Sequence, residues 1–296
     1  MGAKAVNTSF GDGLAAAARS IIADARQAVT NPELSDPEAV HAVRRALKRW
    51  RALMRLLSGP LGEPADLMRT DARDLMRALS DARDGQAALD ALADLQESDL
   101  ALSATSAGTI RGKLTEIRDA AGQTSFTGEM RQRLTQYLDD ASASVESWPL
   151  SSISFDTIAD GLSATYRRAR QLMPEDWLAA DPEHLHDLRR RVVEHRHQMD
   201  LIEPLWPRLG KVWLEEAQRL RNRLGACQDL EMLARFAGPR QPLARWRSRL
   251  LPAIEARRAA HLKSGARVAS RLFAEKPKAF RKRIAALWTA RRNRKR

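Results

Sequence analysis

The second half of this chain repeats motifs of its first half in the same order, and this repeat constrains the fold more than any other feature. Asp36-Pro37-Glu38 returns as Asp181-Pro182-Glu183, and the His-x-x-Arg-Arg motif at His41 returns at His186, an offset of 145 residues (186 − 41 = 145). The stretch Leu79–Asp84 is answered by Leu224–Asp229 at the same offset. These ordered matches predict an internal duplication of helical bundles.

The chain is predicted to be helical almost throughout. Ala, Leu, Arg, Glu and Asp dominate, apolar residues recur at spacings of three and four, and runs of β-branched residues are absent. In the first half, a basic helix is opened by Ser35-Asp36-Pro37 and ended by Ser58-Gly59-Pro60. The other helices expected in this half cover residues 14–30, 64–81, 86–95, 109–121 and 129–147, with a polar connector at 103–108. The predicted fold class is all-α.

The basic helix has an apolar face and a cationic face. At about 100° of turn per residue, its cations lie with His41 within an arc of roughly 80°: Arg44, Lys48, Arg51 and Arg55. The opposing side, predicted to face a core, carries Val43, Leu47, Trp50, Met54 and Leu57. A basic stripe is usually a solvated face. This one lacks acidic partners four residues away, so its cations repel one another unless an anion is bound.

The charge balance favours a polyanionic partner. The 296 residues carry 50 Lys and Arg against 37 Asp and Glu, a net charge of +13. This excess predicts attraction to nucleic acid, an anionic membrane or a phosphate polymer. Cys227 is the only cysteine, which excludes an intramolecular disulfide and a cysteine-based zinc site. Neither a signal peptide nor an apolar stretch of membrane-spanning length is present, so we expect a soluble cytoplasmic protein without a membrane partner.

Composition also divides the chain. Pro and Ser cluster without charge at 148–154, and acidic residues are absent after Glu275. We therefore predict a first bundle at 1–148, a linker at 149–154, a second bundle at 155–275 and a basic tail at 276–296. The first part of the tail has a helical apolar edge, whereas Arg291–Arg296 are expected to fray and to be available to a polyanion.

Two copies of a His-x-x-Arg helix, each followed in its own half by a Leu-x-x-x-x-Asp turn, resemble the CHAD family (conserved histidine α-helical domain) from about Phe10 to Phe273. The resemblance implies two four-helix bundles related by a pseudo-twofold axis, around a basic central cavity. It implies that this cavity binds inorganic polyphosphate without catalysis and without a cofactor; association with polyphosphate granules would follow from such binding. The residues expected to line the cavity are His41, Arg44, Lys48, Arg51, Arg55, Arg69 and Arg73 from the first half and His186, Arg189, Arg196, His197, Arg219 and Arg223 from the second.

Some of these assignments rest on less than the others. The helices of Arg69, Arg73, Arg219 and Arg223 match the family by composition alone. The second copy also departs from the first, since register places Val193 where the first has Lys48 and Asp200 where it has Arg55. We therefore expect the first half to dominate affinity. His197 lies near the second stripe, and its protonation is expected to strengthen binding at mildly acidic pH. Asp84 and Asp229 match the family's turn and are expected to cap a helix or pair with a cation.

Two other functions compete with this interpretation. Non-specific nucleic-acid binding through the basic tail and surface is the alternative, although only 5% of residues are aromatic and no base-stacking platform is evident. A metal-dependent enzyme is disfavoured, because the pairs His184/His186 and His195/His197 are spaced by two residues and do not share a helical face. The chain also lacks a P-loop, a G-x-S-x-G motif and an H-E-x-x-H motif, so neither catalysis nor a bound metal is expected.

Overall fold

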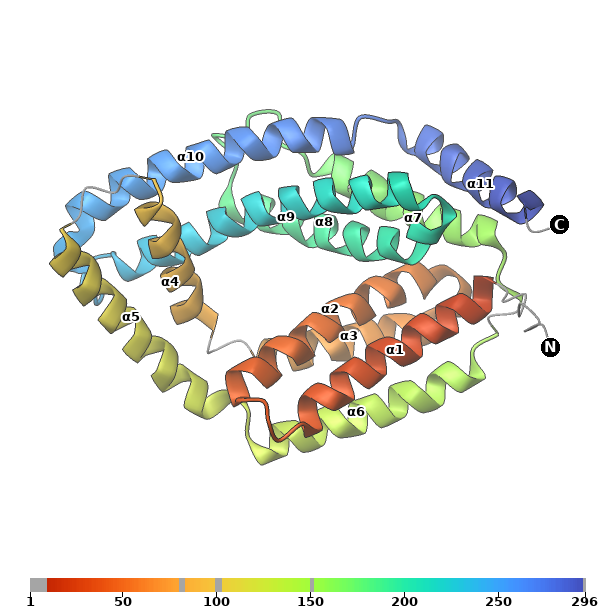
Figure 1. Ribbon diagram of the computed structural model, residues 1–296, viewed down its shortest axis with the longest axis horizontal. Helices are drawn as coiled ribbons and strands as arrows, with labels where there is room; N and C mark the ends of the chain where they lie inside the picture. Colours follow the sequence, from red (N-terminus) through yellow and green to blue (C-terminus); the bar gives the residue numbers. More distant parts are fainter. Residues whose placement is uncertain (1–9, 80–82, 99–102, 150–151, 295–296) are drawn as a thin grey trace, which may run out of the picture.

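The computed structural model describes residues 10–79, 83–98, 103–149 and 152–294, and the regular structure within these ranges is helical (Figure 1). The all-α prediction is thereby confirmed. In chain order the α-helices are α1 (Phe10–Thr30), α2 (Asp36–Leu61), α3 (Glu63–Ala78), α4 (Arg83–Gln96), α5 (Ala104–Ser125), α6 (Gly128–Ser147), α7 (Phe155–Gln171), α8 (Pro182–Ile202), α9 (Pro207–Phe236), α10 (Arg247–Leu272) and α11 (Pro277–Arg294).

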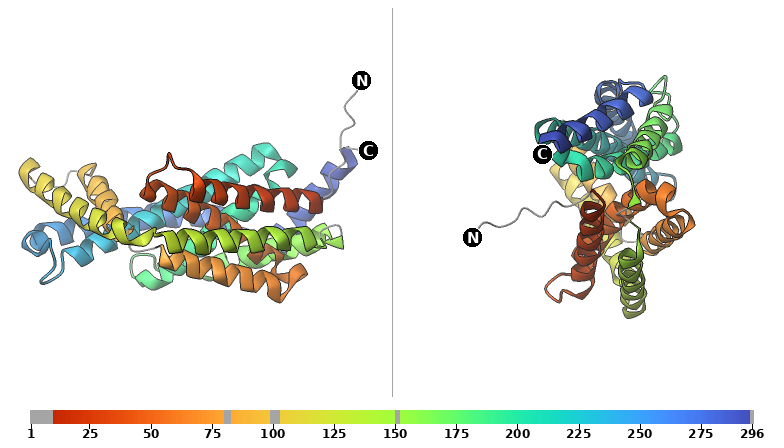
Figure 2. Two further views of the ribbon diagram at one scale, coloured as in Figure 1. Left: turned by 90° about the horizontal axis from the view of Figure 1, so that it is seen from below. Right: turned by 90° about the vertical axis from the view of Figure 1, so that its right-hand side faces the viewer.

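The helices form two groups that lie side by side along the long axis of the molecule. The end-on view in Figure 2 separates α1, α2, α3 and α6 from α7 to α11. Helix α2 joins the groups, because it packs against α1 and α3 on its own side and against α7 and α8 on the other. At the far end, α4 leaves the first group and packs along α9, with α5 beside it. Helices of the first half therefore complete the packing of the second.

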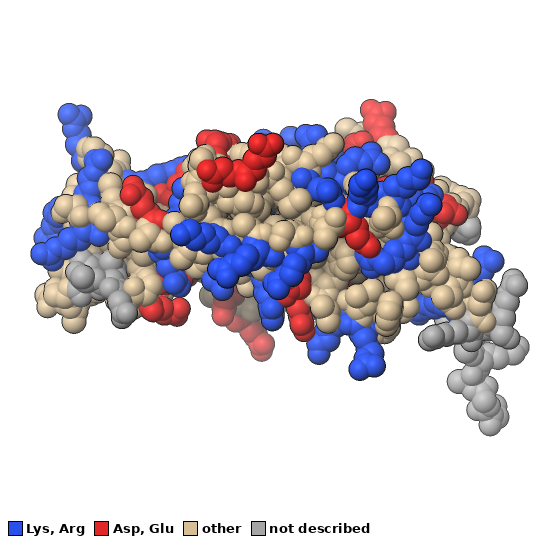
Figure 3. Space-filling model, turned by 90° about the horizontal axis from the view of Figure 1, so that it is seen from above, with Lys and Arg blue, Asp and Glu red and all other residues tan. Residues whose placement is uncertain are grey.

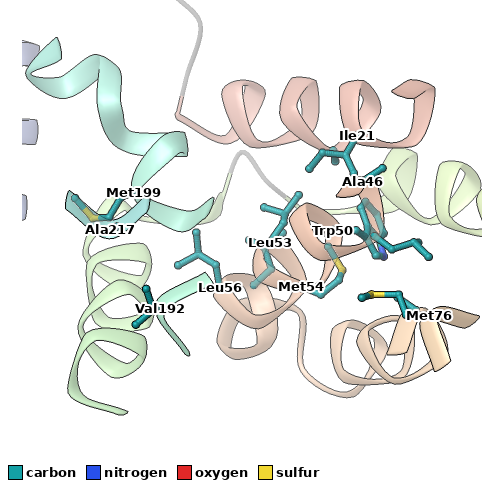
Figure 4. Packing of buried hydrophobic residues seen from close by; sticks show 14 of the residues in the cluster. Ile21, Ala46, Trp50, Leu53, Met54, Leu56, Met76, Val192, Met199 and Ala217 are labelled. Carbon is teal, nitrogen blue, oxygen red and sulfur yellow. The ribbon is translucent and has the colours of Figure 1, made fainter. Parts of the chain in front are cut away.

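The apolar face predicted for the basic helix is confirmed. Five residues of α2 that the sequence places on this face are buried: Val43, Leu47, Trp50, Met54 and Leu57. Figure 4 shows Leu53 and Leu56 of the same helix lying between Trp50 and Val192 of α8. The buried amide of Gln198 on α8 also donates a hydrogen bond to the carbonyl oxygen of Ala52 at 3.0 Å. The apolar side of α2 thus forms the centre of the molecule.

There are two hydrophobic cores among the described residues, and each draws on both halves of the chain. The larger core runs through both groups and includes Trp50, Tyr166 and Phe280. The smaller core joins α4 and α5 to the C-terminal part of α9 and to α10, with Leu92 and Leu250 among its members. The internal duplication, the pseudo-twofold axis and the division at 149–154 stay predictions; residues 150–151 of that linker lie outside the described ranges.

Several helix boundaries differ from the predicted ones. Helix α1 begins at Phe10, before the two glycines that were expected to precede it. Helix α2 continues through Pro60, because a proline in the last turn removes only one intrahelical hydrogen bond. The chain then turns at Gly62, whose φ of 64° favours glycine. The end predicted at Asp81 for the third helix lies outside the described residues; α3 ends at Ala78.

The expected polar connector is helical, and so are residues 291–294 of the tail, which were expected to fray. Helix α5 begins at Ala104, where the Ser103 hydroxyl accepts a hydrogen bond from the backbone of Ser106, so residues 104–108 are not a loop. The tail forms α11, which buries Phe280 and Ile284. Arg291–Arg294 are helical rather than frayed, and residues 295–296 lie outside the described ranges.

Candidate functional site

The cationic face predicted on α2 lies against the second group of helices. Four of its cations are partly buried, and His41 is exposed: the cations are Arg44, Lys48, Arg51 and Arg55. Exposed Lys and Arg are spread over the face seen in Figure 3, interleaved with Asp and Glu, so surface charge alone does not single out a site. The candidate binding site is formed by the cations that the packing of α2, α8 and α9 brings together.

Arg44 has a structural partner. Its guanidinium donates hydrogen bonds to the carbonyl oxygens of Met76 at 2.7 Å and Leu79 at 3.0 Å. These carbonyls close the C-terminus of α3, where the last four carbonyl groups of a helix lack intrahelical partners. Arg44 therefore holds α3 against α2, in addition to any contact it makes with an anion.

Cations from α2, α8 and α9 meet around two histidines. Although the residue as a whole is exposed, partial desolvation of its ring lowers the pKa of His41, and so do the positive charges of Lys48, Arg45, Arg221 and Arg44. We call the group formed by Lys48 of α2, Arg196 and His197 of α8 and Arg221 of α9, together with His41, the cationic cluster.

The second histidine of this cluster overturns one expectation. Burial and the charges of Arg196, Arg49, Arg221 and Lys48 lower the pKa of His197 to about 3. His197 is therefore neutral at mildly acidic pH, and the expectation that its protonation strengthens binding there is wrong. Burial contributes most to this low pKa, and four nearby cations lower it further.

The C-terminal part of the stripe has a buried counter-ion. The Nε of Arg55 lies 4.0 Å from an Oε1 of Glu194, which is 8% exposed and pairs with Arg191 at 2.5 Å. Burial lowers the pKa of Arg51, and the charges of Arg69, Arg190 and Arg55 add to this, whereas Glu194 opposes it. The arginines at this end of the stripe therefore carry more positive charge than the neighbouring carboxylates neutralise.

In the second copy of the motif, one glutamine holds both predicted residues. The side chain of Gln228 accepts a hydrogen bond from Arg189 at 3.0 Å, and its amide nitrogen contacts Nδ1 of His186. A Cβ at Gly225 would lie 3.2 Å from a guanidinium nitrogen of Arg189, so the glycine gives this side chain room to cross α9. Arg189 and Arg221 line a pocket of about 270 Å³ with Asp229 and residues of α4.

Four predicted residues lie apart from the cationic cluster or are already paired. Arg69 pairs with Asp66, and Arg73 pairs with Asp74. Arg219 pairs with Glu216, and Arg223 contacts the ring of His261 on α10. At about 100° per residue, Arg219 and Arg223 lie roughly 160–200° around α9 from Arg221. Arg219 nevertheless lines a pocket with Arg196 of the cationic cluster, so the assignments of Arg219 and Arg223 stay predictions.

Sequence reasoning missed Arg221 and Gln228. Both lie on one side of α9, at a spacing of seven residues, together with Gly225. A helical wheel centred on the buried Leu220 and Leu224 leaves Arg221 and Arg223 on opposite flanks, each about 80° from the centre of the apolar stripe. Composition does not indicate which flank of α9 faces the cationic cluster, because this depends on the position of α8.

Neither a metal centre nor a membrane span is found in the described part of the chain. Within it, His, Cys, Asp and Glu side chains do not gather in threes that could hold a metal ion. The described helices are all too short or too polar to cross a bilayer.

Comparison with known proteins gives consistent results. The family model described as "CHAD domain" matches residues 14–238. The solved structure of PptA from Streptomyces chartreusis is 17% identical with a TM-score of 0.64, and the match covers 90% of this chain and 99% of that one. The crystal structure of the CHAD domain from the plant Ricinus communis is 17% identical with a TM-score of 0.60, covering 94% and 92%. A search of curated proteins found no match.

Proposed function

This chain belongs to the CHAD domain family, whose members are linked to polyphosphate, and on that premise we propose that it binds inorganic polyphosphate through the cationic cluster. The proposed role is binding without catalysis, and it would bring the protein to polyphosphate granules.

The observation that carries the proposal is the depressed pKa of His41 and His197. Burial is the largest cause in both cases, and the charged neighbours that lower the pKa further are Lys or Arg, from α2 and α9 for His41 and from α2, α8 and α9 for His197. Positive charges held together in this way repel one another, and a bound polyanion relieves the repulsion. Phosphate oxygens suit such a site, because Arg donates paired hydrogen bonds and stays charged when partly buried.

The length of the stripe suits a polymer rather than a single phosphate. From His41 to Arg55 the helix rises about 21 Å, with a cation at nearly every turn of about 5.4 Å. A chain of phosphates laid along this face would meet the cationic cluster first and the arginines near Glu194 further on. Such a ligand presents charge at a regular spacing and has no bases to be recognised.

The test is a titration with long-chain polyphosphate and, separately, with a DNA duplex at equal phosphate concentration, each at several salt concentrations. The variant Lys48→Gln/Arg221→Gln removes two charges from the cationic cluster. The control Arg267→Gln/Arg271→Gln removes two charges from exposed side chains of α10 that are not predicted site residues. Losing two charge-assisted hydrogen bonds should weaken polyphosphate binding about a hundredfold. The salt dependence should fall by about two counterions, by analogy with nucleic acids.

The control should change affinity by less than about threefold, the scale of a screened surface charge. Equal losses in the two double variants would refute the assignment to the cationic cluster. The nucleic-acid alternative is tested with Arg291→Gln/Arg292→Gln in α11. If DNA binds as tightly as polyphosphate and this variant loses both, the basic C-terminal helix is the binding element and the proposal fails.

A further inference from the structure

A second pocket lies at the C-terminal end of α2, between this helix, α7 and α8. It encloses about 630 Å³ and is lined by one arginine from each helix: Arg55, Arg168 and Arg191. Its walls include Leu56 and Ala164. This volume is within the range of small-molecule sites, about 300–1,000 Å³, and is larger than a lone phosphate needs. The pocket is therefore both cationic and partly apolar.

The packing of α7 onto α2 shapes the pocket. A Cβ at Gly161 would lie 3.0 Å from both the carbonyl oxygen and a side-chain carbon of Leu56. The absence of a side chain at Gly161 thus allows the two helices to approach closely and to form one wall. Helices on three sides place one arginine each around the pocket.

Charge is not balanced in this pocket. Glu194 pairs with Arg191 at 2.5 Å but lies 4.0 Å from the Nε of Arg55, too far for a hydrogen bond. This Nε is buried and lacks a hydrogen-bond partner in the described part of the chain. A buried donor of this kind is rare unless water or a ligand satisfies it.

The third arginine adds to the excess. Arg168 is exposed and forms no ion pair with another described residue. Asp160 also lines the pocket, but its carboxylate is taken by Arg281. Asp66, which acts on Arg55 from outside the pocket, pairs with Arg69. Arg281 is shared between Asp160 and Asp156, so the three arginines of the lining face the carboxylates of Asp160 and Glu194 with a net excess of one positive charge.

We propose that this pocket is a separate site for a small phosphomonoester, whose dianionic phosphate binds Arg55 and Arg168 while its organic part lies against Leu56 and Ala164. A phosphomonoester is close to dianionic near neutral pH, so it can accept hydrogen bonds from both Arg55 and Arg168 and more than balances the single excess positive charge. Arginine forks suit its oxygens. The pocket shares Arg55 with the far end of the stripe on α2, whereas Arg168 lies outside that stripe and the cationic cluster lies outside the pocket.

The experiment is isothermal titration calorimetry of the full chain with AMP and with glucose 6-phosphate. Adenosine and glucose serve as control ligands that lack the phosphate group. Arg168→Gln removes a pocket cation that is exposed and makes no described ion pair. Arg167→Gln is its matched control, since Arg167 is the adjacent exposed arginine of α7 and does not line the pocket. Arg168→Gln should weaken phosphomonoester binding about tenfold, and Arg167→Gln less than about twofold. The compounds without phosphate should not bind.

A parallel titration separates this proposal from the previous one. Arg168→Gln should bind polyphosphate as the wild type does, and Lys48→Gln/Arg221→Gln should keep its affinity for AMP. Binding of AMP but not glucose 6-phosphate, or the reverse, identifies the organic part and supports the site. Failure of both phosphomonoesters to bind, equal losses in the Arg167 and Arg168 variants, or loss of AMP binding in the cluster variant would each overturn it.

Discussion

Replacing His197 by Gln should make the protein more tolerant of acid. A neutral histidine whose folded-state pKa is depressed takes up a proton on unfolding at any pH below its unfolded-state pKa. The folded state therefore loses stability as pH falls below about 6.5, and the loss continues down to the folded pKa. For His197 that folded pKa is about 3. A Gln at this position does not titrate and lacks this loss.

The magnitude follows from the width of this window. At 1.36 kcal/mol per pH unit, His197 removes about 2 kcal/mol of unfolding free energy between pH 6.5 and 5. His195 provides a matched comparison. It is fully buried against Tyr166 and Phe273, accepts a hydrogen bond from Trp213 at 2.8 Å, and also has a pKa lowered to about 3. The lowering there comes from burial and from Arg283, away from the cationic cluster.

The assay is urea denaturation followed by far-UV circular dichroism at pH 7 and pH 5, for wild type, His197→Gln and His195→Gln. Each variant should lose about 2 kcal/mol less than wild type between the two pH values. If His197→Gln loses as much stability as wild type, the burial of a neutral histidine among cations is refuted.

Two further predictions concern stability. Arg44→Ala should lower the free energy of unfolding by about 2–3 kcal/mol, because it leaves the carbonyl oxygens of Met76 and Leu79 without their donor; urea denaturation measures this, and an equal effect of the exposed-site variant Arg45→Ala would contradict it. Asp94→Asn should speed amide hydrogen exchange in α4 and α5 and cost about 2 kcal/mol, because Asp94 accepts hydrogen bonds from Arg257 and His261 of α10. Asp90 accepts a hydrogen bond from Gln86 of its own helix, so Asp90→Asn should leave that exchange unchanged.

Local chemistry predicted the helices better than their ends. The amphipathic pattern around Trp50 gave the buried side of α2, and the predicted 129–147 helix differs from α6 by one residue at its start. The errors occurred where a residue type that favours loops was tolerated at a helix terminus. Pro60 lies in a last turn, and Ser106 follows a serine cap. Propensity does not distinguish such residues from those that end a helix.

The sequence predicted those features of the candidate site that lie along a single helix. The stripe on α2 follows from periodicity, and the second copy led to His186 and Arg189, which Gln228 holds together. The sequence could not supply the neighbours. Whether Arg221 or Arg223 faces the cationic cluster depends on where α8 lies, and the neutrality of His197 depends on burial among cations from three helices. Both are tertiary properties.

The placement of α4 and α5 has a consequence for synthesis of the protein. The apolar face of α4, including Leu92, is covered by residues near the end of α9 and in α10, such as Leu233 and Leu250. At about 5–20 residues per second, a ribosome needs roughly 7–28 s to proceed from Leu92 to Leu233. During that time a hairpin of two helices emerges without its partner surface. A nascent chain with such an uncovered face is a natural client for chaperones, and it completes its smaller core late in translation.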